Sequence, residues 1–308
     1  MVTGGAGAVG RHLVKYLLAR GYSVRVLDYK AGLLAGLDGD GRLELLEGGV
    51  EDAGVVRRGM EGVDTVVHLA WSFSERARDL FSNDLPGHVN LLDSTMEHGV
   101  KNFIYTSSAV VYGRPRLVPV EEGHPCSVGE ARKPLYAAAK LAAESLCLAY
   151  ASQHRLASTV FRFWWAYGEE IGGKHLRDMI RTALAGEVVA VPRGAGGSFL
   201  DLDDLGAAVE LAMTRAAPGG RVYNLGSIFV TWEEVARVVL GFTGNRAPLQ
   251  VVEQGEWNGS AFLADAWQLD TRKAENELGL AVREREARAK ARLEQAIERC
   301  VIQVQSVG

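Results

Sequence analysis

Short apolar runs alternate with amphipathic stretches along the first half of the chain. Four runs rich in β-branched and aromatic residues predict buried strands: YSVRVLDY (22–29), DTVVHLAW (64–71), NFIYTSS (102–108) and STVFRFWW (158–165). Between them, apolar residues recur at helical spacing in 11–21, 85–99 and 135–154. This alternation of strands and helices predicts an α/β fold with a doubly wound parallel sheet.

The pattern changes after about residue 168. Helices are expected at 172–187 and 231–244, the second with Thr231 as its N-cap, and strands at 187–192 and 221–227. The segment 199–216 indicates a strand that leads into a helix. The last helix, 283–300, alternates charges that we expect to be solvated. We therefore predict a main domain over 1–168, to which 199–227 returns, and a smaller lobe over 169–308.

Composition and charge exclude several classes of protein. The 308 residues are 47% hydrophobic and 23% charged, which is ordinary for a globular chain. The net charge is −4 and no block of Lys and Arg stands out, so we expect no nucleic-acid partner. Apolar runs are too short for a membrane span, and the start lacks the pattern of a signal peptide. Three widely spaced cysteines, Cys126, Cys147 and Cys300, predict a reduced, cytoplasmic protein. We expect no metal site.

The chain opens with TGGAGAVG, in which Gly4, Gly7 and Gly10 follow one another at intervals of three. A glycine turn between a strand and a helix lets a pyrophosphate approach the backbone and the helix N-terminus. Asp28 ends the next predicted strand, where a carboxylate can accept hydrogen bonds from an adenosine ribose. It would repel a 2′-phosphate and so favours NAD over NADP, although Lys30 is close. Taken alone, each feature also fits an ordinary turn.

The first predicted strand has very little chain before the glycines. Met1 and Val2 alone precede Thr3, whereas a central strand usually has about five residues. We therefore expect that the sequence as given lacks a few residues at its start.

Tyr136 and Lys140 lie four residues apart in LYAAAK, and a helix would place them on one face. An ammonium beside the phenol would lower the tyrosine pKa from about 10 toward the working range. Such a tyrosine can exchange a proton with an alcohol while a hydride moves to or from a nicotinamide. Ser108, at the end of the preceding strand, could hydrogen-bond the same substrate oxygen.

With these motifs the chain resembles the extended short-chain dehydrogenase/reductases. Within them it is similar to the NAD-dependent epimerase/dehydratase branch, and in particular to its UDP-galactose 4-epimerase-like members. The resemblance covers nearly the whole chain and implies a Rossmann-type sheet with a smaller C-terminal substrate lobe. The matching pieces, in order, are TGGAGAVG, Asp28, HLA (68–70), Asn83 in NDLPGHVNLL, YTSSAVVYG (105–113), YAAAK, FRFWWAYG (161–168), FLDLDDLG (199–206) and YNLGS (223–227).

The resemblance also implies a role for each matching residue. Tyr136 would be the general acid/base, Lys140 would hold the nicotinamide ribose and polarise Tyr136, and Ser108 would polarise the reacting oxygen. His68 is a tempting acid/base, but a histidine at the end of a buried strand is more often structural. The residues expected to bind NAD are Gly4, Gly7, Ala8, Val9, Gly10, Asp28, Val50, Leu69, Ala70, Asn83, Tyr136, Lys140 and Trp164.

Several positions depart from the family pattern. Gly48-Gly49 stands where members carry Gly-Asp, so an adenine contact is lost or comes from Glu51 or Asp52. The segment SSAVVYG lacks the Asp-Glu pair of the 4,6-dehydratases, which argues against dehydration.

Other departures concern the substrate. Trp165 replaces an Asn, and Gly197-Ser198 replaces the Arg-Asp with which nucleotide-sugar epimerases meet the diphosphate. Trp164 and Trp165, with Trp71 and Phe73, suggest an aromatic pocket, or else core packing. A basic group could instead hold an anionic substrate, or be solvated surface: Lys174, His175, Arg177, Arg181 and Arg193.

The leading hypothesis is an NAD-dependent oxidoreductase that acts on a secondary alcohol of a sugar or sugar-like small molecule. If the keto intermediate is retained and reduced on its other face, the enzyme is an epimerase. If the intermediate leaves, the enzyme is a dehydrogenase or reductase, with a non-nucleotide, aromatic or apolar substrate as the alternative. A catalytically silent NAD-binding regulator is the rival from another class. The resemblance also implies a homodimer, with the helix that carries Tyr136 at the interface.

Overall fold

The main sheet of the computed structural model has the arrangement that the alternating pattern predicts. The structure describes residues 1–37, 41–244 and 246–307. Within these residues seven strands run parallel in the order β10-β6-β5-β4-β1-β2-β3. Their bounds are β1 (Val2–Thr3), β2 (Val24–Asp28), β3 (Leu43–Glu47), β4 (Thr65–His68), β5 (Asn102–Thr106), β6 (Ala157–Phe163) and β10 (Gly219–Leu225). The order reverses between β1 and β4, and a crevice at this switch point is where such sheets bind ligands.

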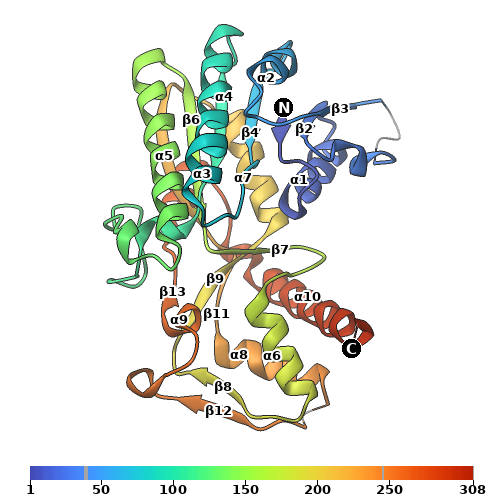
Figure 1. The fold of residues 1–308 in the computed structure, drawn as a ribbon, viewed down its shortest axis with the longest axis vertical. Coiled ribbons are helices and arrows are strands. Elements are labelled where there is room, and N and C mark those ends of the chain that lie inside the picture. The colour runs from blue at the N-terminus through green and yellow to red at the C-terminus, as the bar shows by residue number, and fades with distance from the viewer. Residues whose placement is uncertain (38–40, 245, 308) are drawn as a thin grey trace.

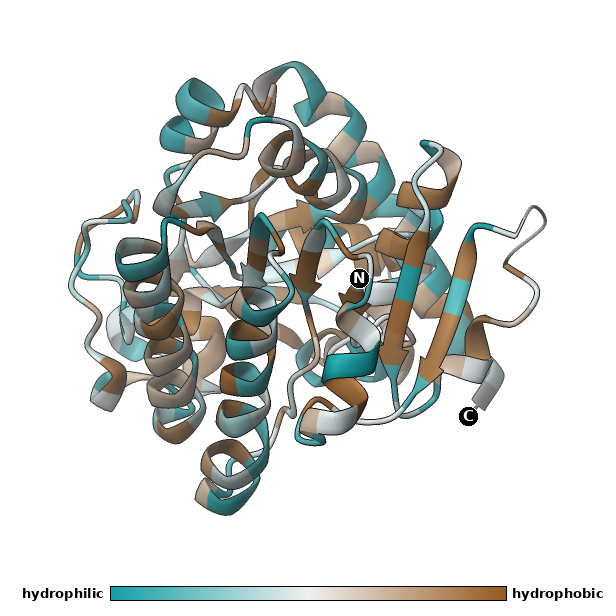
Figure 2. Ribbon diagram, turned by 90° about the horizontal axis from the view of Figure 1, so that it is seen from above, coloured by the Kyte–Doolittle hydropathy of each residue, from teal (hydrophilic) through white to brown (hydrophobic). Residues whose placement is uncertain are grey.

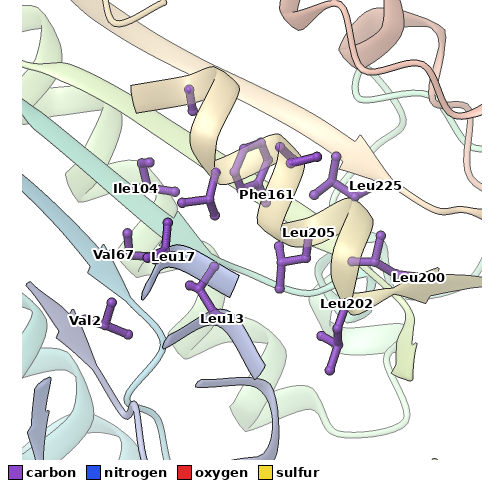
Figure 3. Packing of buried hydrophobic residues seen from close by; sticks show 14 of the residues in the cluster. Val2, Leu13, Leu17, Val67, Ile104, Phe161, Leu200, Leu202, Leu205 and Leu225 are labelled. Atoms are coloured by element: carbon purple, nitrogen blue, oxygen red, sulfur yellow. The ribbon is translucent and has the colours of Figure 1, made fainter. Parts of the chain in front are cut away.

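Helices cover both faces of the sheet (Figure 1). On one face α1 (Ala8–Ala19) packs against α7 (Leu202–Thr214); on the other, α4 (Leu85–Glu97) lies between α2 (Ala53–Met60) and α5 (Pro134–His154). In Figure 3, leucines of α1 and α7 meet Val67, Ile104 and Phe161 of the sheet. Figure 2 shows mostly apolar strands between helices that carry one apolar and one polar side.

The remaining elements form a smaller lobe, in the lower half of Figure 1. Its central strand β9 (Gly196–Asp201) pairs with β7 (Trp165–Tyr167), β11 (Ile228–Thr231) and β13 (Ala266–Trp267), while β8 (Val189–Pro192) pairs with β12 (Leu249–Val252). Its helices are α6 (Lys174–Leu184), α8 (Trp232–Phe242), α9 (Ala261–Ala264) and α10 (Glu286–Val307). Thr231 caps α8 as expected, in a capping box with Glu234. The domain boundary at residue 168 stays a prediction.

The periodic pattern predicts no element between residues 43 and 60, and the structure has β3 and α2 there. Strand β3 lies at the edge of the sheet and its five residues, LELLE, are largely exposed. Helix α2 has eight residues, which is little more than two turns. An exposed edge strand and a short helix both give a weak periodic signal, because neither buries a long apolar face.

The charges of the C-terminal helix are not all solvated, and in this respect the prediction was wrong. In α10, Arg292 reaches the fully buried carboxylate of Asp201 (Nε–Oδ2, 3.1 Å) and also pairs with Asp203. Arg285, just before the helix, pairs with the buried Asp204 at 3.0 Å. These aspartates lie at the junction of β9 and α7, so Arg285 and Arg292 neutralise carboxylates that folding has removed from water.

Arg292→Met is expected to destabilise the fold by about 2–3 kcal/mol, because it leaves the carboxylate of Asp201 buried without its cation. Arg299→Met, at an exposed position of the same helix, should change stability by less than about 0.5 kcal/mol. Urea unfolding of both variants measures the difference. Equal effects in the two variants would show that the arginine–aspartate cluster adds nothing specific.

Candidate active site

The turn between β1 and α1 can form only with glycines at particular positions. Gly4 has a φ of +70°, and a Cβ on it would lie 2.7 Å from the backbone nitrogen of Ala70. A Cβ on Gly10 would lie 2.2 Å from the carbonyl oxygen of Gly4. Gly7 is the N-cap of α1 and brings no side chain to the helix end. The backbone N–H groups of the first helical turn therefore face an uncovered space, as an anion site requires.

Asp28, at the carboxyl end of β2, holds the loops beside this turn. Its Oδ2 accepts a hydrogen bond from the N–H of Ala6 (3.0 Å), and its Oδ1 accepts one from the N–H of Lys30 (2.9 Å). Through Ala6 the carboxylate holds the glycine turn in place, and it also lines the adjoining cavity.

Beyond Asp28 the cavity is bounded by the loop that follows β3. The side-chain amide of Asn90 donates to the carbonyl oxygens of Val50 and Glu51, both at 3.1 Å, and so fixes this loop. Glu51 lines the cavity, and its carboxylate accepts a hydrogen bond from the hydroxyl of Tyr29. Burial, and after it the carboxylate of Glu51, raise the pKa of Tyr29 to about 12. Asp52 instead caps α2, accepting from the N–H groups of Gly54 and Val55. Of the two acids considered for the adenine end, Glu51 faces the cavity.

The catalytic candidates lie at the other end, on α5 and after β5. Tyr136 and Lys140 occupy the first two turns of α5, and Ser108 caps the short turn that follows β5. Lys140 is 4% exposed; its Nζ donates to the carbonyl oxygen of Thr106 (3.0 Å) and lies 4.2 Å from the ring centre of Trp71. Its ammonium is thus held by a carbonyl and an aromatic face.

The expected lowering of the tyrosine pKa does not occur in the structure. Burial, and then the negative charge of Asp84, raise the pKa of Tyr136 above its ordinary value. Lys140 Nζ is directed to Thr106 and lies 5.8 Å from the ring centre of Tyr136. Burial lowers the pKa of Lys140 itself to about 7, against the opposite effects of Asp84 and Glu144. The sequence prediction counted the neighbouring charge and missed the desolvation of both groups.

Two acidic residues at this end were missed by the sequence analysis. Asp84 lines the cavity beside the predicted Asn83, and its carboxylate accepts from the N–H of Ser72 at 3.1 Å. The chain around it, Leu80–Asp84, is π-helical, which shifts the facing positions relative to an α-helical pattern. Glu144, four residues after Lys140, was signalled by that helical spacing.

Glu144 anchors the catalytic helix to the sheet. Its carboxylate forms a buried ion pair with Arg162 of β6 (Nε–Oε1, 3.0 Å) and accepts a hydrogen bond from Ser107. Arg162 belongs to β6 and Ser107 directly follows the neighbouring strand β5, so these contacts hold α5, and with it Tyr136 and Lys140, over the sheet.

One continuous cavity of about 680 Å³ joins these parts. Every residue that the sequence analysis assigned to catalysis or cofactor binding lines it: Gly4, Gly7, Ala8, Val9, Gly10, Asp28, Val50, Leu69, Ala70, Asn83, Ser108, Tyr136, Lys140 and Trp164. The cavity runs from the loop after β3, past the glycine turn, to Tyr136. It thus combines a backbone anion site along its length with a group at one end that can exchange protons.

A second cavity of about 470 Å³, called here the outer cavity, adjoins the first. The two share Phe73, Ser108, Tyr136 and Trp164 as wall residues. Phe262, Asp265 and Trp267 of the smaller lobe also line the outer cavity.

The four aromatic residues proposed for a substrate pocket do not all line the same cavity. Trp164 and Phe73 line the outer cavity, and Trp71 lies under Lys140. Trp165 packs on Phe199, and its Nε1 donates to the carbonyl of Gly172 (3.0 Å). Trp165 therefore packs against the hydrophobic core of the smaller lobe.

The basic residues proposed as an anion site do not line either cavity. Lys174 and Arg181 both pair with Asp178, and Arg193 pairs with Glu253. His175 stacks on Phe262, with ring centres 4.5 Å apart. These contacts favour the surface interpretation of the group.

His68 is fully buried at the end of β4, as the structural alternative predicts. Its Nδ1 lies 2.7 Å from Thr3 Oγ1, and burial holds its pKa well below the ordinary value. It is absent from the walls of both cavities.

Comparison with known proteins assigns the chain to a family. The profile of the NAD dependent epimerase/dehydratase family matches residues 1–226. The chain belongs to this family. It is an NAD-dependent enzyme of the extended short-chain dehydrogenase/reductase type, as its sequence motifs predict.

Three proteins to which the chain is similar have different names and sources. The UDP-glucose 4-epimerase of Corynebacterium glutamicum is 29% identical over 91% of this chain and 89% of the relative. A 3β-hydroxysteroid dehydrogenase/Δ5→4-isomerase of Mycobacterium tuberculosis is 30% identical over 80% of this chain and 70% of the relative. The crystal structure of the Bordetella bronchiseptica enzyme WbmG with NAD and UDP superposes with a TM-score of 0.72, at 26% identity, over 91% and 88% of the two chains.

The residues of the cavity suit the cofactor of this family. Side chains at Gly4 and Gly10 would collide with backbone, so glycine keeps the turn narrow and leaves the end of α1 uncovered for a pyrophosphate. Asp28 offers carboxylate oxygens at the end of β2, where a ribose acceptor is needed. In the part of the chain that the structure describes, no helix is long and apolar enough to cross a membrane.

The low pKa of Lys140 predicts a difference in pH dependence between the ligand-free protein and Lys140→Met. The unfolded chain keeps a lysine pKa of about 10.4, so between about pH 7 and pH 10 it binds more protons than the folded chain at this site. Lys140 therefore makes the folded state gain stability as the pH rises through this window. The unfolding free energy of the wild type should rise relative to that of Lys140→Met from about pH 6 to pH 9. Parallel curves in urea unfolding would contradict this.

Proposed function

We propose that the protein transfers a hydride between NAD and a secondary alcohol, or the matching ketone, on a sugar or another ring-bearing molecule. The observation that carries the proposal is the single cavity, with the glycine turn at its centre and Tyr136, Lys140 and Ser108 at one end. One relative is named for a sugar nucleotide and another for a hydroxysteroid, which supports chemistry on a hydroxyl group in either context.

Tyr136 is proposed as the general acid/base. Its raised pKa keeps it a neutral phenol, which can donate a proton to a ketone oxygen. In the direction of oxidation its proton has to leave first. The amine of Lys140, with a pKa of about 7, can accept a proton near neutral pH. Ser108 Oγ, at the wall shared by both cavities, is proposed to hydrogen-bond the reacting oxygen.

The cofactor is proposed to lie along the first cavity. Gly4, Gly7 and Gly10, with the backbone of Ala8 and Val9, would hold the pyrophosphate. Asp28 would hold the adenosine ribose, and Lys140 the nicotinamide ribose. Further contacts are proposed for Val50, Leu69, Ala70, Asn83 and Trp164. The oxidised nicotinamide supplies the hydride acceptor and a positive charge.

The fate of the oxidised product separates two activities. If the cleft keeps the ketone and reduces it on the other face, the enzyme is an epimerase; if the ketone leaves, it is a dehydrogenase or reductase. The aromatic residues of the outer cavity favour the second activity, on a substrate other than a nucleotide sugar.

Tyr136→Phe should lower kcat by about 10²–10⁴-fold, because it removes the proton donor and acceptor. The affinity for NAD, measured by calorimetry, should stay within about twofold, because the phenyl ring is retained. Tyr150→Phe, on the same helix and bonded to Asp93, is the matched control and should keep full turnover. NADH fluorescence with a panel of sugar and ring alcohols measures turnover. Turnover that survives in Tyr136→Phe would disprove the acid/base role, and an inactive wild type would support the regulator.

We also propose that the enzyme is a homodimer that pairs α4 and α5 with their counterparts. The segment AAAKLAAESLCLAY of α5 carries small and apolar residues on more than one face, which suits contact between helices. Light scattering is expected to give twice the mass of the chain, and the mass of a single chain would exclude the dimer. A cytoplasmic location is proposed as well, because the cysteines at 126, 147 and 300 are all unpaired thiols.

A further inference from the structure

The outer cavity is placed to determine which alcohol reaches Tyr136. It shares Phe73, Ser108, Tyr136 and Trp164 with the cofactor cavity. A molecule that fills it therefore lies against the phenol and the serine hydroxyl at once. The other residues that line the outer cavity then determine which molecule can carry the reacting hydroxyl.

Trp164 forms a fixed aromatic wall on one side. Its ring stacks on Phe262 at 5.4 Å with an interplanar angle of 9°, and meets Phe199 and Trp232 edge-on at 5.3 and 5.7 Å. A Cβ at Gly197 would lie 2.1 Å from the Trp164 ring. With this indole in place, position 197 of β9 has no room for a side chain, charged or otherwise.

Phe73 supplies a second aromatic surface. Its side chain is 79% exposed, yet it stacks on the ring of Tyr136 with ring centres 5.9 Å apart. An exposed phenyl ring beside a catalytic hydroxyl leaves apolar area that a ligand can cover. Trp267, buried between the outer cavity and the core, adds to the apolar wall.

The charged groups around the outer cavity are largely neutralised. Arg114 forms an ion pair with Asp265 at 2.8 Å, and Lys133 with Glu75 at 3.0 Å. Arg132 stacks its guanidinium on Phe262, 4.7 Å from the ring centre. Of the three cations that line the outer cavity, only Arg132 has no ion pair with a described residue, so a diphosphate could meet a second cation only if an existing pair opened, whereas an apolar ring needs none of them to change.

We propose that the outer cavity binds an uncharged, ring-bearing apolar secondary alcohol, and that Phe73 and Phe262 determine this preference. The inference rests on the proposed function, since it takes Tyr136 as the group that meets the hydroxyl. It adds that the alcohol has an alicyclic or polycyclic body and lacks a nucleoside diphosphate.

Calorimetric titration of the Tyr136→Phe enzyme with NAD present tests binding apart from chemistry. The probes are 2-decalol, a 3β-hydroxysteroid, the uncharged sugar methyl galactoside, and UDP-glucose. At least one of the two apolar alcohols should bind at least about tenfold more tightly than both sugar probes. Equal or tighter binding of UDP-glucose or methyl galactoside, or no binding of either apolar alcohol, would overturn the proposal.

Two variants locate the preference. Phe73→Ala and Phe262→Ala should each weaken binding of the apolar alcohol by about tenfold and leave the affinity for NAD within about twofold. Phe242→Ala, a partly exposed phenylalanine at the end of α8, is the matched control and should change neither. Unchanged binding in both cavity variants would remove these residues from the site. Tight binding of an apolar alcohol that the wild type does not oxidise would leave this inference standing and refute the proposed function instead.

Discussion

The burial of the Lys140 ammonium is the constraint on which the catalytic end depends. Its Nζ is held by the carbonyl of Thr106 and faces Trp71, so helix α5 is tied to the end of β5. The ion pair between Glu144 and Arg162 makes a second tie one turn farther along the helix. Both contacts hold the helix that carries Tyr136 against the sheet. Preorganisation of this kind is what acid–base catalysis needs, and its cost is the desolvation that lowers the lysine pKa.

The two cavities use opposite kinds of surface. The cofactor cavity is bounded at its centre by glycine backbone, because any side chain at Gly4 or Gly10 would collide with the main chain. The outer cavity is bounded by large aromatic rings, one of which fills the space above Gly197. Backbone N–H groups suit the pyrophosphate that all members of an NAD-dependent family share. Side chains, which can vary without disturbing the sheet, are suited to distinguish one substrate from another.

Much of the fold and the site follows from local patterns along the chain. The apolar runs predicted β2, β4, β5 and β6, and helical spacing predicted α1, α4 and α5. Local patterns failed where an element is short or exposed, as in β3 and α2. They failed again for Asp84, because a π-helical turn changes which positions face the cavity. In the last helix, a pattern of alternating charges did not reveal that Arg292 meets a carboxylate from β9.

The sequence alone determined the family, the cofactor, and many of the residues that line the first cavity, because glycine spacing and the Tyr–Lys interval are local features of the chain. The tertiary structure alone decided the protonation of Tyr136, which depends on burial and on Asp84 rather than on its helical neighbour. It also decided that Trp164 faces the outer cavity while Trp165 packs in the core. The desolvation of a side chain and the direction in which it points depend on segments that are far apart in the chain, so no local pattern encodes them.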